Sequence, residues 1–182
     1  MGRIGCMSLV GVAERVNMTV PSASPLFLRE TEIRRGIELL FFGYANLYRP
    51  SDSLLAEQGL GRAHHRSLYF IARQPGMTIG ALLRLLGITK QSLGRVLNEL
   101  GQRDLIEVTA GEEDRRQRLL RLTEKGAKLE ADLFAVIRES LSQAYGQAGQ
   151  EAVTGFWRVL ELMSPPAERA RVAELGREPR KN

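Results

Sequence analysis

The sequence predicts a mainly α-helical protein that contains one small β-hairpin, and three observations support this fold class. Long segments that begin near Thr31 and after Thr123 repeat apolar residues at helical intervals. Between them, two shorter helical patterns are separated by Gly87, a residue type that readily ends a helix in the left-handed conformation. Two runs of alternating apolar and polar residues follow, as expected for half-buried strands. This order predicts a winged helix-turn-helix flanked by long N- and C-terminal helices.

The composition of the chain limits its function only broadly. Apolar residues make up 43% and charged residues 26% of the 182 residues, as in ordinary globular proteins. The net charge of +5 favours a polyanionic partner without identifying one. The single cysteine, Cys6, excludes an intrachain disulfide and favours the reducing cytoplasm. No run approaches the roughly 20 apolar residues of a membrane span, so we expect a cytoplasmic protein without a membrane partner.

The N-terminal region joins an irregular start to a strongly apolar helix. Residues 1–25 lack useful periodicity and predict a disordered tail. Residues 26–60 predict an N-terminal dimerisation region, because a helix that is apolar on more than one side needs more than one neighbour. Pro50 should kink or end this helix near Arg49. The residues that we expect in the subunit interface are Ile33, Ile37, Leu40 and Phe41.

The central segment, residues 61–123, contains the pattern of a helix-turn-helix. Thr78 is placed to cap one short helix, Gly87 to end it, and Thr89 to cap a second. A tight glycine-containing turn between two short helices is typical of this motif. A helical hairpin in a bundle explains the same spacing equally well, so the chemistry of the side chains has to separate the two.

The second short helix has two chemically different faces. At roughly 100° per residue, its leucine and valine side chains fall on one side. The opposite side carries Gln91, Arg95 and Asn98, whose amide and guanidinium groups are those that read base edges. Base reading is expected mainly from Gln91 and Arg95, because the N-terminal half of a recognition helix enters the groove. The candidate DNA-contacting residues of this helix are Thr89, Lys90, Gln91, Ser92, Arg95 and Asn98.

A β-hairpin is predicted after the second helix. Ile106 and Val108 alternate with polar neighbours in its first strand, as do Leu120 and Leu122 in its second. The loop between the strands reads GEEDRRQR, which by itself is typical of a solvated charge cluster. Behind a helix-turn-helix, the same hairpin predicts a wing. Its candidate DNA contacts are Asp114, Arg115, Arg116 and Arg118, whereas phosphate should repel Glu112 and Glu113 at the tip.

Residues 124–163 predict two C-terminal dimerisation helices. The first begins after Thr123, which is placed to cap it. The second carries Phe156, Trp157 and Leu160, which we expect in the subunit interface. The run Ser164-Pro165-Pro166 should stop this helix, and residues 164–182 predict a polar C-terminal tail.

These motifs resemble those of the MarR family of bacterial transcriptional regulators. The strongest match is DRRQRLLRLTEKG, residues 114–126, which fits the family's wing signature of Asp, any residue, Arg, and a spaced Leu-Thr and Gly. The segment LLGITKQSLGRVLNELGQRDLIE, residues 85–107, matches the turn and the recognition helix. The resemblance covers about Thr31 to Met163, and within the family the chain is similar to a subgroup linked to photosynthetic electron-transport genes.

The resemblance implies a homodimer that binds a pseudo-palindromic operator in double-stranded DNA. The helix from Thr89 to Arg103 would then lie in the major groove, and Arg116 would reach the minor groove with help from Asp114. Many members respond to small, often phenolic, anionic ligands, so the resemblance also implies a small organic ligand, whose contacts the sequence does not identify. Family peroxide sensors carry a cysteine in the first long helix, where this chain reads IELLFFGYANLY, so thiol sensing there is not expected.

Other chemistries find little support in the sequence. His64 and His65 would point about 100° apart on a helix and cannot easily chelate one ion. The acids Glu112 to Asp114 lack calcium-loop spacing, and the chain shows no nucleophile elbow, phosphate loop or dinucleotide fingerprint. We therefore expect no enzymatic activity, no metal and no cofactor. The remaining alternative is a winged-helix module that docks proteins without sequence-specific DNA binding, which would expose apolar or mixed-charge residues in place of Gln91 and Arg95.

Overall fold

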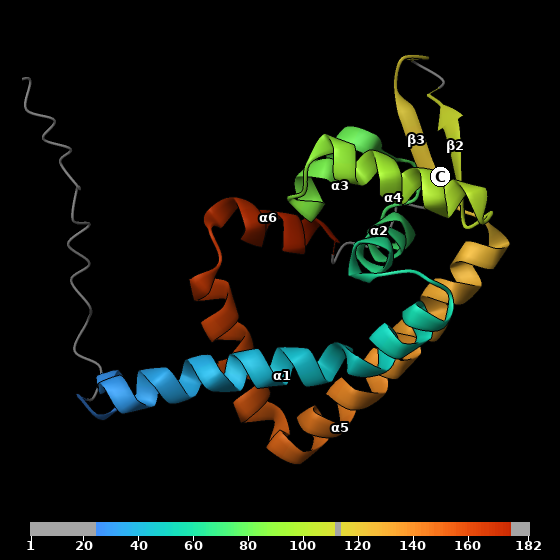
Figure 1. The fold of residues 1–182 in the computed structure, drawn as a ribbon. Helices are drawn as coiled ribbons and strands as arrows, with labels where there is room; N and C mark the ends of the chain where they lie inside the picture. Colours follow the sequence, from blue (N-terminus) through green and yellow to red (C-terminus); the bar gives the residue numbers. More distant parts are fainter. Residues whose placement is uncertain (1–24, 112–113, 176–182) are drawn as a thin grey trace, which may run out of the picture. The chain divides into compact units, whose positions relative to one another are not determined.

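The structure is a computed structural model that describes residues 25–111 and 114–175 (Figure 1). Most of the predicted N-terminal tail, including Cys6, lies outside the described residues, and only its last residue, Pro25, is described. Glu112 and Glu113 of the predicted wing tip also lie outside them. The chain divides into two compact units, residues 1–42 and 43–182, and the division falls inside helix α1, Glu30–Glu57.

The described part of the first unit consists of a 3-10 helix, η1 (Pro25–Leu28), and the first half of α1. Glu30 and Glu32 lie in the first turn of α1, where acids favour a helix because its N-terminal dipole is positive. Arg34 pairs with Glu30 one turn earlier, with its Nη2 2.6 Å from Oε1. The apolar residues of this half remain exposed, which leaves it without a core of its own among the described residues.

The second unit is built around one apolar core. It contains α2 (Arg62–Arg73), α3 (Ile79–Leu86), α4 (Lys90–Gln102) and α5 (Glu124–Met163), together with a small sheet. Leucines from every one of these helices are fully or almost fully buried, and they meet the sheet at Leu120. The core members with the least exposure are Leu55, Leu68, Ile71, Leu82, Leu93, Leu100, Leu105, Leu120 and Leu133.

The sheet has three antiparallel strands in the order β1-β3-β2. The hairpin of β2 (Ile106–Ala110) and β3 (Arg118–Leu122) was predicted (Figure 1). Its register places Val108 opposite Leu120. The sequence did not predict β1 (Met77–Thr78), which pairs Met77 with Leu120. Val108 is 45% exposed although alternation predicted it inside, because the core covers β2 only at its first residue, Ile106.

Local capping residues set the ends of the helices, as the sequence predicted. The Thr78 hydroxyl oxygen accepts the Ala81 N–H at 3.1 Å at the start of α3. Gly87 ends α3 in the left-handed region, with φ 63° and ψ 29°, a conformation that glycine adopts without steric cost. Thr123 accepts the Gly126 N–H at 3.0 Å at the start of α5. Each threonine cap satisfies a backbone donor that has no partner inside its helix.

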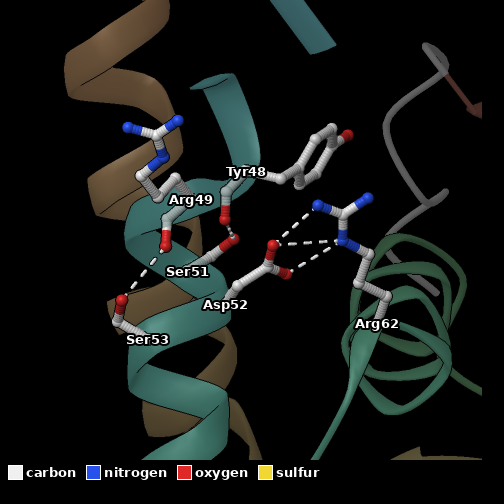
Figure 2. Close-up of polar contacts among 6 residues, drawn as sticks. All are labelled: Tyr48, Arg49, Ser51, Asp52, Ser53 and Arg62. Carbon is white, nitrogen blue, oxygen red and sulfur yellow. Dashed lines mark hydrogen bonds and ion pairs between the residues drawn. The ribbon is translucent and has the colours of Figure 1, made fainter. Parts of the chain in front are cut away.

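Pro50 does not end the first helix, so that part of the prediction is wrong. Helix α1 continues through Pro50 to Glu57. Two serine hydroxyls just after the proline hydrogen-bond to main-chain carbonyls: Ser51 Oγ donates to Tyr48 O at 2.9 Å, and Ser53 Oγ donates to Arg49 O at 3.3 Å (Figure 2). Both are local bonds from a serine to a carbonyl of the preceding turn. Leu55, after the proline, is buried in the core of the second unit, so packing holds the continued helix.

The C-terminal helices follow the predicted plan with one addition. Helix α5 is interrupted at Gly149, whose φ of 81° and ψ of 164° are not helical, so it consists of two successive helices. It ends at Met163 before the predicted stop. The segment predicted as a polar tail contains a further helix, α6 (Pro166–Leu175). The sequence did not indicate it, because it has no apolar stripe. No helix in the part of the chain that the structure describes is long and apolar enough to cross a membrane.

Candidate nucleic-acid interface

Helix α4 presents one polar face to solvent and buries the other. Leu93, Val96 and Leu100 are at most 7% exposed and hold the helix against the core. Gln91, Ser92, Arg95 and Asn98 are all exposed, as are Thr89 and Lys90 before them. The division of the helix that the residue spacing predicted is therefore present in the structure. Its exposed face carries amide and guanidinium groups, which form directional hydrogen bonds with base edges.

The N-terminus of α4 is capped by its own side chains. Thr89 Oγ1 accepts the Ser92 N–H at 3.1 Å and donates to Ser92 Oγ at 2.9 Å. Thr89 therefore has a structural role in addition to any contact with a partner. Within the described residues nothing lies within 4 Å of a Cβ built on Gly94, so packing inside the chain does not require a glycine there.

Asp114 accepts two hydrogen bonds that close the wing loop. Asp114 Oδ1 accepts the Arg116 N–H at 2.9 Å, and the Asp114 carbonyl accepts the Gln117 N–H at 3.0 Å. Gly111 is buried beside this turn, and a Cβ there would lie 2.8 Å from the Asp114 carbonyl oxygen. Asp114 thus holds the backbone of Arg116 in place. The candidate contact side chains Arg115, Arg116 and Arg118 are exposed.

The two histidines of α2 have structural partners. His64 Nδ1 accepts the Gly61 N–H at 3.1 Å, so its Nε2 carries the hydrogen and donates to Glu99 Oε2 of α4 at 2.8 Å. His65 is buried, and desolvation lowers its pKa, with Asp52 acting in the opposite direction. Among the described residues, no three His, Cys, Asp or Glu side chains are grouped as metal ligands would be.

A cavity of about 500 Å³ lies in the second unit, between the second half of α1, α2 and α5. The family resemblance implied a small organic ligand, but the sequence did not identify any residue that would contact it. Its walls are largely aromatic and aliphatic, with three nitrogen-bearing side chains on α2. The lining residues are Tyr44, Leu47, Tyr48, Arg62, His65, Arg66, Tyr69, Phe70, Phe134, Ile137 and Leu141.

Two arginines of this cavity are held by neighbouring elements. Arg66 Nη2 donates to the carbonyls of Leu85 and Leu86 at 3.4 and 3.1 Å, which satisfies the C-terminus of α3. Arg62 forms a two-pronged pair with Asp52 of α1, its Nη2 2.7 Å from Oδ2 and its Nε 3.0 Å from Oδ1 (Figure 2). The bond to Arg62 lowers the pKa of Asp52, so this carboxyl is ionised at neutral pH.

The fold and this exposed surface define a winged helix-turn-helix protein of the kind found among DNA-binding regulators. A sequence model described as the MarR family matches residues 58–117. Over 144 residues the chain is 47% identical to the HTH-type transcriptional regulator PetP of Rhodobacter capsulatus, covering 79% of this chain and 87% of the relative. The chain belongs to the MarR family and is a transcriptional regulator of that family, which confirms the resemblance drawn from its motifs.

Solved structures of the same family share the fold at low sequence identity. A mutant MarR from E. coli complexed with operator DNA superposes with a TM-score of 0.59 and 21% identity, covering 77% of this chain and 99% of that one. A MepR–DNA complex from S. aureus gives a TM-score of 0.59 and 20% identity, covering 69% and 93%. A third MarR family transcription regulator reaches 0.65 with 19% identity, covering 82% and 98%.

Proposed function

We propose that this regulator binds a pseudo-palindromic operator in double-stranded DNA as a homodimer, and that a small anionic ligand modulates its binding. The observation that carries the proposal is the exposed polar face of α4. Gln91, Arg95 and Asn98 share this face and are exposed, while the opposite side of the helix is buried. A recognition helix needs this division, because one side must pack on the protein while the other reads bases.

In this proposal, residues 61–123 form the DNA-binding domain and α4 enters the major groove. Arg95 reads a base edge, as arginine does with the two acceptors of guanine. Gln91 reads a second base edge nearer the start of the helix. Thr89, Lys90, Ser92 and Asn98 contact phosphates or neighbouring bases. Residues 26–60 and 124–163 supply the dimer helices.

The wing supplies the second contact with DNA. Arg116 reaches into the minor groove, and Arg115 and Arg118 contact phosphates. The bond from the Arg116 N–H to Asp114 supports this role, because it fixes the backbone from which the arginine extends. A fixed backbone reduces the conformational entropy that Arg116 would lose on binding.

Exposed apolar residues support dimerisation in each unit separately. On the first half of α1, Ile33, Ile37, Leu40 and Phe41 are 41–71% exposed. On the second half of α5, Phe156, Trp157 and Leu160 are 37–49% exposed. Large apolar side chains gathered on a helix are typical of an interface, and a second copy of this chain offers the same surfaces.

The cavity between α1, α2 and α5 is the site that we assign to the ligand. Its volume of about 500 Å³ suits a small organic molecule. Tyr44, Tyr48 and Tyr69 offer faces for an aromatic ring, and Arg62 offers a positive charge for an anionic group. A ligand there shifts DNA affinity only as far as it binds the two states of the dimer differently.

The direct test of DNA reading is an Arg95→Ala variant. We expect it to lose about 1–3 kcal/mol of operator affinity and to discriminate less at one base pair of each half-site. The affinity is measured by fluorescence anisotropy on the promoter fragment that the protein protects from nuclease, and on a set of single-base variants of that fragment.

The matched control is Arg138→Ala, which removes the same charge from an exposed arginine of α5. At equal salt this control should retain sequence discrimination, because charge alone contributes to affinity without reading sequence. Wild-type discrimination in the Arg95→Ala protein would contradict the assignment. A wild-type protein that binds all DNA equally would favour the alternative of a winged-helix module that docks proteins.

A further inference from the structure

The first turn of α2 contacts two other helices through neighbouring residues. Arg62, its first residue, pairs with Asp52 of α1. His64, two residues later, donates from Nε2 to Glu99 Oε2 of α4 at 2.8 Å. Gly61, just before the helix, donates its N–H to His64 Nδ1, which fixes the orientation of the imidazole ring. One short turn therefore links the second half of α1 to the helix that carries the candidate base readers.

The guanidinium of Arg62 lines the cavity and also pairs with the partly exposed carboxylate of Asp52. Its central carbon is 5.3 Å from the ring centre of Tyr44 and 5.8 Å from that of Tyr48, and both tyrosines line the cavity. Figure 2 shows Asp52 extending from α1 to the same guanidinium, with the Tyr48 ring beside it. Asp52 engages Nε and one terminal nitrogen, the fork with which arginine binds any carboxylate.

A carboxylate ligand in the cavity therefore meets an arginine that already holds a carboxylate. Two carboxylates that share one guanidinium repel each other, and the planar fork pairs best with one of them. Exchange replaces one charge-assisted pair with another, so the loss of the Asp52 pair is largely offset. The exchange also releases the tie between α1 and α2, because the ligand has no covalent connection to α1.

Building on the proposed ligand site, we infer that Asp52 is a built-in competitor of the ligand for Arg62. An aromatic carboxylate binds by displacing Asp52 from the guanidinium. The first turn of α2, no longer tied to α1, then moves, and α4 moves with it because His64 is hydrogen-bonded to Glu99. Asp52 thus sets the ligand concentration at which the regulator responds, and His64 sets how far α4 follows.

Benzoate and benzamide are a matched pair of probes for this exchange. They have nearly the same shape, but only benzoate carries the charge that competes with Asp52. The variant Asp52→Asn removes the competing charge with little change in side-chain shape. We expect it to bind benzoate roughly three- to tenfold more tightly than the wild type in calorimetry without DNA, with benzamide affinity unchanged. Arg62→Gln should lower the affinity for benzoate by about tenfold or more.

The outcomes separate this inference from the proposed ligand site. If the wild type binds neither probe, or if Arg62→Gln binds benzoate as well as the wild type, the cavity is not an anion site and both proposals fail. Equal benzoate affinity in the wild type and Asp52→Asn leaves the ligand site standing and overturns the competition. Tighter binding of both probes by Asp52→Asn also overturns it, since a looser cavity would then explain the gain.

The second step is tested with His64→Leu, because His64 does not line the cavity. This variant should bind benzoate within about twofold of the wild type. The ratio of operator affinities with and without saturating benzoate should move toward one, because the bond to Glu99 is lost. His64→Gln retains a donor that can reach Glu99 and should restore part of the response. A full wild-type response in His64→Leu would overturn this link.

Discussion

His65 illustrates how burial alone changes the charge of a residue. Its side chain is 5% exposed, and it meets Tyr48 edge-on with ring centres 6.1 Å apart. Desolvation lowers its pKa from the ordinary value of 6.5, and Asp52 opposes this only in part. The folded protein therefore keeps this imidazole neutral at a pH where the unfolded chain would protonate it.

This difference predicts a pH dependence of the free energy of unfolding. Because the folded pKa of His65 lies below 6.5, the unfolded state binds more protons as the pH falls below that value. The contribution of His65 to the free energy of unfolding should therefore be constant above about pH 6.5. Below about pH 6.5 the free energy of unfolding should decrease as the pH falls toward the folded pKa of His65. Urea unfolding from about pH 7.5 to about pH 5 measures the slope. His65→Gln should flatten this slope, and an unchanged slope in the variant would contradict the assignment.

At the scale of elements, the start of α5 is locked onto the turn that follows α4. Thr123 Oγ1 donates to the Asp104 carbonyl at 2.6 Å, and the Thr123 N–H donates to the Leu105 carbonyl at 3.2 Å. Asp104 itself has a positive φ of 57°, which tightens the turn. Gly126 packs directly on this junction, where a Cβ would lie 1.8 Å from the Leu105 carbonyl oxygen.

Gly126→Ala should therefore destabilise the protein although alanine favours helices. The clash is with backbone, so the junction of β2, β3 and α5 has to shift, and we expect a loss of about 1–3 kcal/mol or more. The control is Gly101→Ala in α4, where, apart from the neighbouring residues and backbone of its own helix, no described atom lies within 4 Å of the added carbon. That variant should be neutral or more stable by up to about 1 kcal/mol. Chemical denaturation measures the free energy of unfolding of both variants. Equal free energies of unfolding in Gly126→Ala and Gly101→Ala would contradict the predicted clash.

The same scale shows which features the sequence was able to predict. The caps Thr78 and Thr123 and the turn at Gly87 were predicted because each depends on a few consecutive residues. Strand β1 was not, because two residues carry no periodicity and its existence depends on pairing with Leu120 far along the chain. The persistence of α1 beyond Pro50 was not predicted, because it depends on the packing of later residues such as Leu55, which a rule for single residues omits.

The candidate site also has features that the sequence predicted and features that only the structure revealed. The two faces of α4 follow from spacing along one helix, so burial of Leu93 and exposure of Arg95 matched the prediction. The contact between Arg62 and Asp52 joins two helices, and no spacing rule connects an aspartate in one helix with an arginine ten residues later in the next. The contacts of the cavity were therefore found only in the structure.

For the whole molecule, the central prediction concerns the proposed dimer. We expect the wild type to sediment as a dimer at micromolar concentration. Ile37→Glu should weaken association by at least about tenfold, because two unpaired carboxylates would be buried in the interface. Sedimentation velocity over a dilution series measures the change.

Val108→Glu is the matched control for this experiment. Val108 is 45% exposed and Ile37 is 47% exposed, but Val108 lies on the wing strand β2, outside the proposed interface. The control should therefore remain dimeric at the same concentrations. A wild-type protein that is monomeric at micromolar concentration would contradict the dimer, as would equal effects of the two substitutions.

Strand β1 has a consequence for how the second unit opens. Thr78 belongs to β1 and at the same time caps α3, and Gly76 donates its N–H to the Leu120 carbonyl of β3 at 2.8 Å. The hairpin cannot detach from the helix-turn-helix without loosening the first turn of α3. We therefore expect the wing and the helix-turn-helix to unfold locally as one cooperative unit, with amide hydrogens that exchange through a common opening step. A regulator built this way would present its two proposed DNA-reading elements together or not at all.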